Sequence, residues 1–117
     1  DTGGACKVLH TLFELGEEPI PIAAVLINHY VDMYRVKCAK IDGRRADDIA
    51  RYYNYKGRDF VLNNAMRDTA KLSVGALRRS MRVLDDLDRA LKSTAVDAKI
   101  LLEEAIVKLS VIAGSGQ

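Results

Sequence analysis

The chain has 117 residues, of which 49% are hydrophobic and 29% are charged, and its net charge is only +2. This length suits one domain with its own core, and no apolar run approaches the roughly 20 residues that a membrane span needs. Cys6 and Cys38 are too few for a disulfide scaffold or a cysteine-based zinc site, so we interpret them as buried free thiols. The N-terminus lacks the features of a secretory signal, and its opening Asp-Thr-Gly-Gly, without Met, predicts a piece of a longer chain.

The charges are distributed unevenly along the chain. Residues 1–34 have a balance of −4, residues 35–82 hold thirteen basic and five acidic side chains, and residues 83–117 have a balance of −2. A basic middle between acidic ends permits an anionic partner but does not require one.

The first two expected helices are joined by a tight turn. A helix over residues 5–15 ends at Gly16, which tolerates the left-handed conformation that closes a helix. Pro19 and Pro21 suit the first turn of a second, long helix over 21–40. Its expected buried face follows helical spacing and comprises Ile22, Val25, Leu26, His29, Met33 and Val36.

The basic middle predicts two shorter helices. Residues 41–43 break the long helix, and Asp47 or Asp48 can cap a short helix that extends to about residue 53. A turn over 54–57 precedes a fourth helix over 58–71. Its expected inward positions are Phe60, Val61, Asn64, Ala65 and Ala70.

Two further helices complete the chain. Ser73 is the expected N-cap of a helix that runs to about residue 92, with the apolar stripe Leu77, Met81, Leu84, Leu87 and Leu91. Asp97 or Thr94 begins a last helix that ends before Gly114, with the stripe Leu101, Leu102, Ala105, Ile106, Leu109 and Ile112. No segment alternates with period two, so we predict an all-α single domain of five to six helices.

No motif predicts catalysis, a metal or a cofactor. The glycines at 3–4 and 114–116 lack the spacing and the Lys-Ser/Thr of a phosphate-binding loop. Cys6 and His10 lie one helical turn apart, but a metal site needs more ligands than this pair. The acids of residues 85–104 alternate with basic residues at helical spacing, which is typical of a solvated helix face; Asp88 and Lys92 are expected to form such a surface pair.

Residues 44–71 also fit a helix-turn-helix that reads DNA. The side chains that would contact DNA are Arg44, Arg45, Arg51, Lys56 and Arg58. Tyr52, Tyr53 and Tyr55 could stack on bases. Asp59 and Asp68, expected on the exposed face of the second helix, oppose this interpretation because carboxylates repel phosphates.

Three motifs taken together resemble a known family. They are Leu12…Leu-Gly-Glu-Glu-Pro19, Leu84-Asp-Asp-Leu-Asp-Arg-Ala-Leu-Lys92 and Leu102-Glu-Glu-Ala-Ile-Val-Lys-Leu109, with Ile49, Ala50 and Phe60 between them. In this order the set resembles the C-terminal domain of the delta subunit of bacterial DNA polymerase III, over nearly the whole chain. The tyrosines of 52–55 depart from the family, which usually has a small-residue turn there.

The resemblance implies a scaffold role in a clamp loader, a cytoplasmic multi-subunit AAA+ assembly that places the sliding clamp on primed DNA. The domain would be the helical collar over residues 1–117, without catalytic activity, and its partners would be clamp-loader subunits of the gamma/tau and delta-prime type. Contacts to the clamp and to DNA would belong to an AAA+ part outside this chain.

Within this interpretation, a run of arginines is the candidate subunit interface. Arg78, Arg79 and Arg82, helped by Arg89, lie away from the apolar stripe of their helix, and no acid interrupts residues 73–84. Arginine is enriched at protein interfaces because its planar head pairs with carboxylates while its stem covers apolar surface. The alternative function is the DNA-binding helix-turn-helix.

Overall fold

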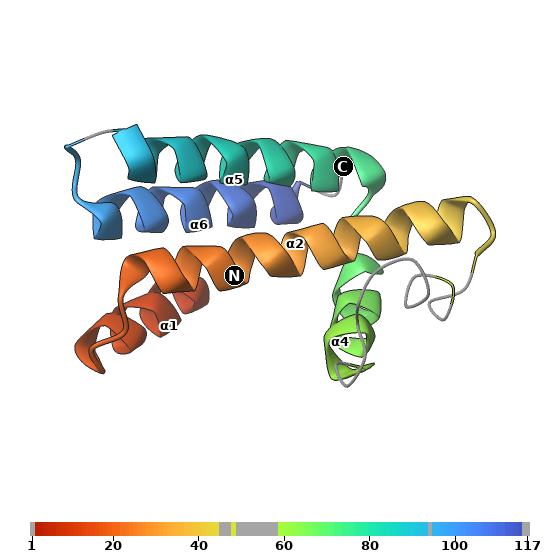
Figure 1. Ribbon diagram of the computed structural model, residues 1–117, viewed down its shortest axis with the longest axis horizontal. Coiled ribbons are helices and arrows are strands. Elements are labelled where there is room, and N and C mark those ends of the chain that lie inside the picture. Colours follow the sequence, from red (N-terminus) through yellow and green to blue (C-terminus); the bar gives the residue numbers. More distant parts are fainter. Residues whose placement is uncertain (1, 45–47, 49–58, 94, 116–117) are drawn as a thin grey trace.

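The longest helix, α2 (Pro19–Ile41), crosses the molecule and contacts at least three other helices in this computed structural model (Figure 1). The antiparallel helices α5 (Val74–Ser93) and α6 (Ala98–Gly114) lie side by side along one flank of α2. Helix α1 (Thr2–Glu14) packs on α6, and α4 (Asp59–Thr69) packs on the C-terminal half of α2. The structure describes residues 2–44, 48, 59–93 and 95–115, and none of these forms a strand. The expected all-α fold is confirmed.

The turn between α1 and α2 is built on Gly16. Its φ of +87° lies in the left-handed region, where glycine has no steric penalty. The Gly16 amide donates to the Phe13 carbonyl at 3.0 Å and the Glu17 amide to the Leu12 carbonyl at 2.9 Å, which together form a Schellman motif. Pro19 then begins α2, and Glu18 before it is extended, the conformation that a following proline favours.

Three other predicted helix boundaries are also confirmed, whereas α6 runs through Gly114 rather than ending before it. Gly43, with φ +75°, ends α2 by the same pair of hydrogen bonds that Gly16 makes. The Ala76 amide donates to Ser73 Oγ at 3.0 Å, and the Lys99 amide donates to the Asp97 carboxylate at 2.7 Å. These caps satisfy amides in the first turns of α5 and α6 that have no partner within their helix.

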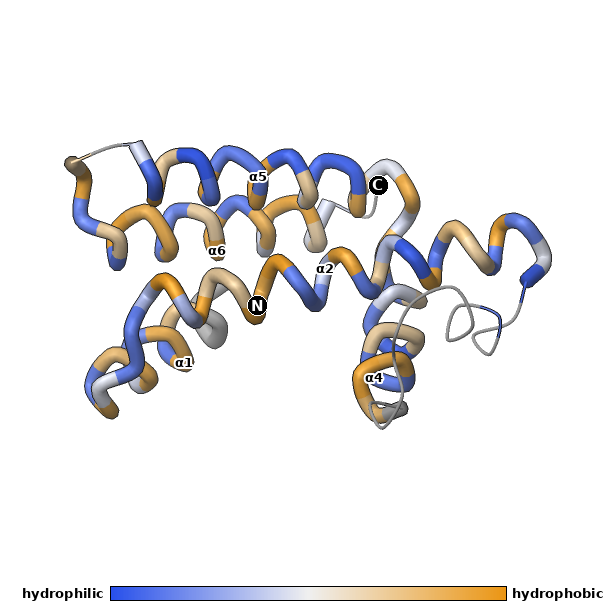
Figure 2. Tube along the Cα trace, viewed as in Figure 1, coloured by the Kyte–Doolittle hydropathy of each residue, from blue (hydrophilic) through white to orange (hydrophobic). Residues whose placement is uncertain are grey.

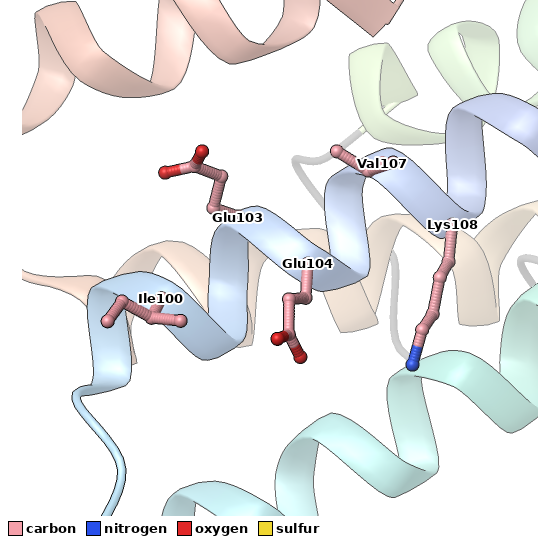
Figure 3. A pocket seen from close by; sticks show the side chains of 5 residues that line it. All are labelled: Ile100, Glu103, Glu104, Val107 and Lys108. Carbon is pink, nitrogen blue, oxygen red and sulfur yellow. The ribbon is translucent and has the colours of Figure 1, made fainter.

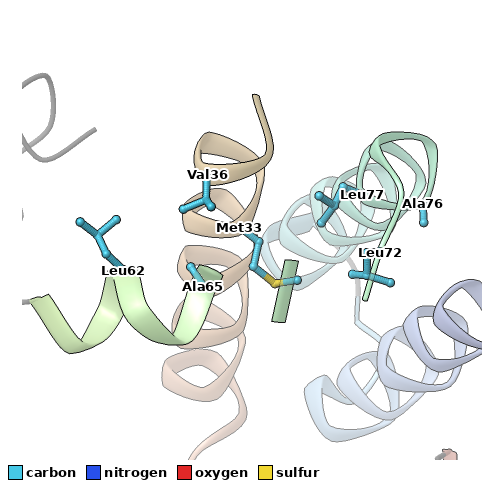
Figure 4. Close-up of a cluster of buried hydrophobic side chains, with 7 residues drawn as sticks. All are labelled: Met33, Val36, Leu62, Ala65, Leu72, Ala76 and Leu77. Carbon is cyan, nitrogen blue, oxygen red and sulfur yellow. The ribbon is translucent and has the colours of Figure 1, made fainter. Parts of the chain in front are cut away.

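Two clusters of buried side chains form the core. One lies where α4 and the start of α5 meet α2 (Figure 4), and it comprises Met33, Val36, Leu62, Ala65, Leu72, Ala76 and Leu77. The other joins α1, α2, α5 and α6, and it comprises Leu9, Ala23, Leu84, Leu87, Leu102, Ala105 and Leu109. Tyr30 of α2 packs against both clusters. The leucine stripes predicted for the last two helices therefore do face inward.

Several inward positions predicted for α2 and α4 are wrong. Val25 is 70% exposed, because the N-terminal half of α2 turns Pro19 and Ala23 inward instead. Phe60 is 65% exposed and Leu62 is buried in its place, so the inward face of α4 is rotated from the one expected. Asn64 and Ala70 are exposed as well, whereas Ala65 is fully buried. Apolar residues lie on both sides of α4, so periodicity alone did not identify its packed face.

The short helix expected between 47 and 53 lies outside the described residues, apart from Asp48, which is helical. The turn expected over 54–57 and the tyrosines at 52, 53 and 55 lie outside them too.

Candidate subunit interface

The outer face of α5 is positioned by the strong amphipathicity of that helix. Its buried side chains lie along one side and are Ala76, Leu77, Ser80, Leu84 and Leu87. Successive positions on a helix are about 100° apart, so this inward stripe turns the arginines outward. Arg78, Arg79, Arg82 and Arg89 are all exposed. We call these four residues the α5 arginine face.

Acidic side chains pair with the basic ones at only one end of the α5 arginine face. In the C-terminal half of α5, Arg89 pairs with Asp85 at 3.0 Å, and Lys92 pairs with Asp88 at 2.9 Å. The expected Asp88–Lys92 surface pair is thus confirmed. In the N-terminal half, Arg78 and Arg82 have no ion-pair partner among the residues that the structure describes. The basic excess therefore concentrates in the N-terminal half of α5.

The residues proposed for DNA contact are not brought together in the described part of the chain. Arg44 is exposed just beyond the end of α2. Arg45, Arg51, Lys56 and Arg58 lie outside the described residues. Asp68, expected on the exposed face of α4, is instead half-buried against α2, where its carboxylate lies 2.9 Å from His29 Nε2. It packs inward because α4 is rotated from the expected orientation.

Polar contacts between α2 and α4 surround Asp68. The Thr69 hydroxyl, fully buried, donates to the Met33 carbonyl at 3.1 Å, and Lys37 Nζ donates to the Thr69 carbonyl at 3.1 Å. Arg67 Nε donates to the Asp68 carboxylate, also at 3.1 Å. This network was not predicted from the sequence, because His29 follows the spacing of the apolar face of its helix.

The network sets two pKa values. Burial acts to raise the pKa of Asp68, but the hydrogen bonds and positive charge of Arg67 and His29 outweigh it, so the pKa lies below its ordinary value. Burial and, to a lesser extent, the Asp68 charge raise the pKa of Tyr30. Asp68 is therefore ionised at neutral pH and ties α4 to α2.

The histidine and cysteine near the N-terminus do not join a larger ligand set. His10 Nε2 lies 3.1 Å from the Glu103 carboxylate and links α1 to α6. Cys6 and Cys38 are free and partly buried. Within the described ranges, no group of three or more His, Cys, Asp or Glu side chains is placed to hold a metal ion. In the same part of the chain, no helix combines the length and apolar character that a bilayer crossing requires.

Fold and surface together define an all-α domain in which the charges of the C-terminal half of α5 are paired within that helix. A family model described as DNA polymerase III delta subunit, C-terminal domain, matches residues 1–109. The chain therefore belongs to this family of replication-subunit domains. No curated protein and no solved structure matches the chain.

Proposed function

We propose that this domain is the oligomerisation scaffold of a clamp-loader delta subunit. The observation that carries the proposal is the family match over residues 1–109. The all-α fold is consistent with a scaffold, since a helical bundle presents rigid outer faces to neighbouring subunits. The domain itself carries no catalytic step, and it acts in the cytoplasm as part of the DNA polymerase III holoenzyme.

The partners in this role are other clamp-loader subunits of the gamma/tau and delta-prime type. Contacts to the sliding clamp and to primed DNA belong to an AAA+ part of the delta subunit that precedes this domain. The collar then contributes to replication indirectly, by holding that part in its place within the assembly.

The α5 arginine face is the surface we assign to one of these partners. Arg78 and Arg82 support the assignment best, because both are exposed and neither has an ion-pair partner among the described residues. An acidic face on a neighbouring subunit would complement them and accelerate association. Arg89 contributes less net charge, because Asp85 already pairs with it at 3.0 Å.

The test reverses the two unpaired charges, as Arg78→Glu with Arg82→Glu, in the full-length delta subunit. We expect the variant to fold normally, since both side chains are exposed, and to join the other clamp-loader subunits at least about tenfold more slowly at low salt. Stopped-flow association at two salt concentrations measures this effect.

The matched control is Lys7→Glu with Lys71→Glu, which changes the net charge equally at exposed sites on other parts of the molecule. An unchanged association rate in the α5 variant would remove these arginines from the interface. Failure of the wild-type subunit to join the others at all would refute the scaffold role itself.

A further inference from the structure

An apolar stripe on α1 stays exposed and continues into the turn before α2. Val8, Leu12 and Leu15 are separated by four and three residues, which places them on one side of the helix. The Leu15 amide still donates to the Thr11 carbonyl at 3.0 Å, so the helical spacing holds as far as Leu15. Val8 is 62% exposed, Leu15 75%, and Ile20, the second residue of α2, 60%.

Three carboxylates accompany these exposed apolar side chains. Glu14 is the last residue of α1, Glu17 and Glu18 lie in the turn, and all three are exposed. None of them forms an ion pair within the described residues. Lys99 of α6 approaches α1, but its Nζ lies 5.3 Å from the centre of the Phe13 ring and pairs with none of these acids. We define the acidic tip as Glu14, Leu15, Glu17, Glu18 and Ile20. Figure 2 shows apolar and hydrophilic positions side by side in this turn.

The backbone of the acidic tip is fixed before any partner binds. The Schellman motif at Gly16 ends α1, and Pro19 and Pro21 restrict the first turn of α2. A rigid surface loses little conformational entropy on binding. Glu14 lies at the negative end of the α1 dipole, where a basic side chain would stabilise the helix better. A charge that opposes local stability is typical of a functional surface.

The acidic tip specifies the charge of a partner, which the outer side of α6 does not. That side of α6 has a hollow lined by Ile100, Glu103, Glu104, Val107 and Lys108 (Figure 3). Its lining carries both signs of charge. Residues 11–28, in contrast, contain three acids and no lysine or arginine. Carboxylates repel nucleic acids and anionic lipids and attract basic protein surfaces, so the acidic tip favours a basic protein partner.

We propose that the acidic tip docks into an apolar pocket, rimmed by lysine or arginine, on another clamp-loader subunit. Leu15 and Ile20 enter the pocket and lose their contact with water, which supplies most of the affinity. Glu14, Glu17 and Glu18 meet the basic rim and accelerate association. This assignment rests on the proposed scaffold function and adds to it a contact whose charge is opposite to that of the α5 arginine face.

The two contacts lie at separate places on the domain. The acidic tip adjoins Pro19, at the start of α2, whereas the beginning of α5 packs with Met33 in one core cluster. Fourteen residues of α2 separate Pro19 from Met33, which corresponds to about 20 Å along the helix. Figure 1 accordingly shows the α1–α2 turn and the start of α5 at opposite ends of the molecule.

Truncation of the two apolar side chains tests the pocket. In the full-length delta subunit, Leu15→Ala with Ile20→Ala should weaken binding to the remaining clamp-loader subunits at least about tenfold, mainly through faster dissociation and at every salt concentration. The control is Ile41→Ala with Val96→Ala, at side chains 64% and 50% exposed elsewhere, and its affinity should equal that of wild type. Circular dichroism verifies that each variant is folded.

Neutralisation of the turn tests the basic rim. Glu17→Gln with Glu18→Gln should slow association at least about threefold at low salt, and the difference should disappear at high salt, because ions screen the attraction. Asp42→Asn with Asp86→Asn is the control, since it changes the net charge equally at exposed sites on other parts of the molecule. Stopped-flow association measures both. Faster association of the Glu17 and Glu18 variant would contradict a basic partner.

A combined variant tests whether the two contacts are separate. Leu15→Ala and Ile20→Ala together with Arg78→Glu and Arg82→Glu should multiply the two individual effects, because distant sites act independently. A combined effect no larger than the stronger single one would overturn the separate contact. Normal assembly of both acidic-tip variants would overturn this inference alone, whereas failure of the wild-type subunit to assemble would refute the scaffold role itself.

Discussion

The two core clusters of this domain are stabilised by different interactions. Around Leu84, buried side chains of four helices pack together, and all of them are leucine or alanine. Where α4 meets α2, the apolar cluster is supplemented by polar contacts from Thr69, Asp68 and Lys37. The long helices α2, α5 and α6 thus associate mainly through apolar stripes, whereas the short α4 also makes specific polar contacts with α2.

The largest expected effect comes from breaking the four-helix cluster. Leu84→Ala should lower the free energy of unfolding by about 2–5 kcal/mol, because Leu84 is only 2% exposed and its removal leaves a cavity. Denaturant unfolding measures the change. Val25→Ala is the control and should stay within about 0.5 kcal/mol of wild type, since Val25 is 70% exposed. A Leu84 effect as small as the control would show that this cluster does not stabilise the fold.

An intermediate effect is expected at the polar junction of α2 and α4. The pKa of Asp68 is lowered in the folded state, so its contribution to stability is complete above its unfolded pKa and is lost as pH falls through the folded pKa. Asp68→Asn should lower the free energy of unfolding by about 0.5–1.5 kcal/mol at pH 5, a range that allows for the partial exposure of the Asp68 side chain. The difference in stability between this variant and wild type should shrink below about pH 4.

Urea unfolding at several pH values between 3 and 5 measures this difference. Asp86→Asn is the control, because Asp86 is exposed and has no ion-pair partner among the described residues. A difference between Asp68→Asn and wild type that stays constant over this pH range would contradict the assignment of the stabilisation to the Asp68 carboxylate.

The smallest expected effect concerns a surface pair that belongs to neither cluster. Asp88 and Lys92 are 2.9 Å apart, with side chains 44% and 73% exposed. A double-mutant cycle with alanine at both positions should give a coupling energy of about 0.3–0.5 kcal/mol, because solvent screens an exposed pair. A coupling above about 1.5 kcal/mol would instead indicate that this face of α5 is desolvated.

Much of the fold could be predicted from local residue patterns. Gly16, Gly43, Ser73 and Asp97 mark helix ends, because the backbone conformation or the hydrogen bond at each place depends on that residue alone. The leucine stripes of α5 and α6 also face inward as predicted. For α5 the physical reason is that a helix with a single apolar side can pack in only one orientation. The exposed α5 arginine face follows from the same periodicity.

Tertiary structure decided what local patterns left ambiguous. Phe60 and Leu62 are both apolar, and only the packing of α4 on α2 determined that Leu62 is buried. His29 and Asp68 are 39 residues apart, so no local pattern could indicate that they pair. In each case the outcome depends on which surfaces meet, because burial and pairing are properties of two elements together.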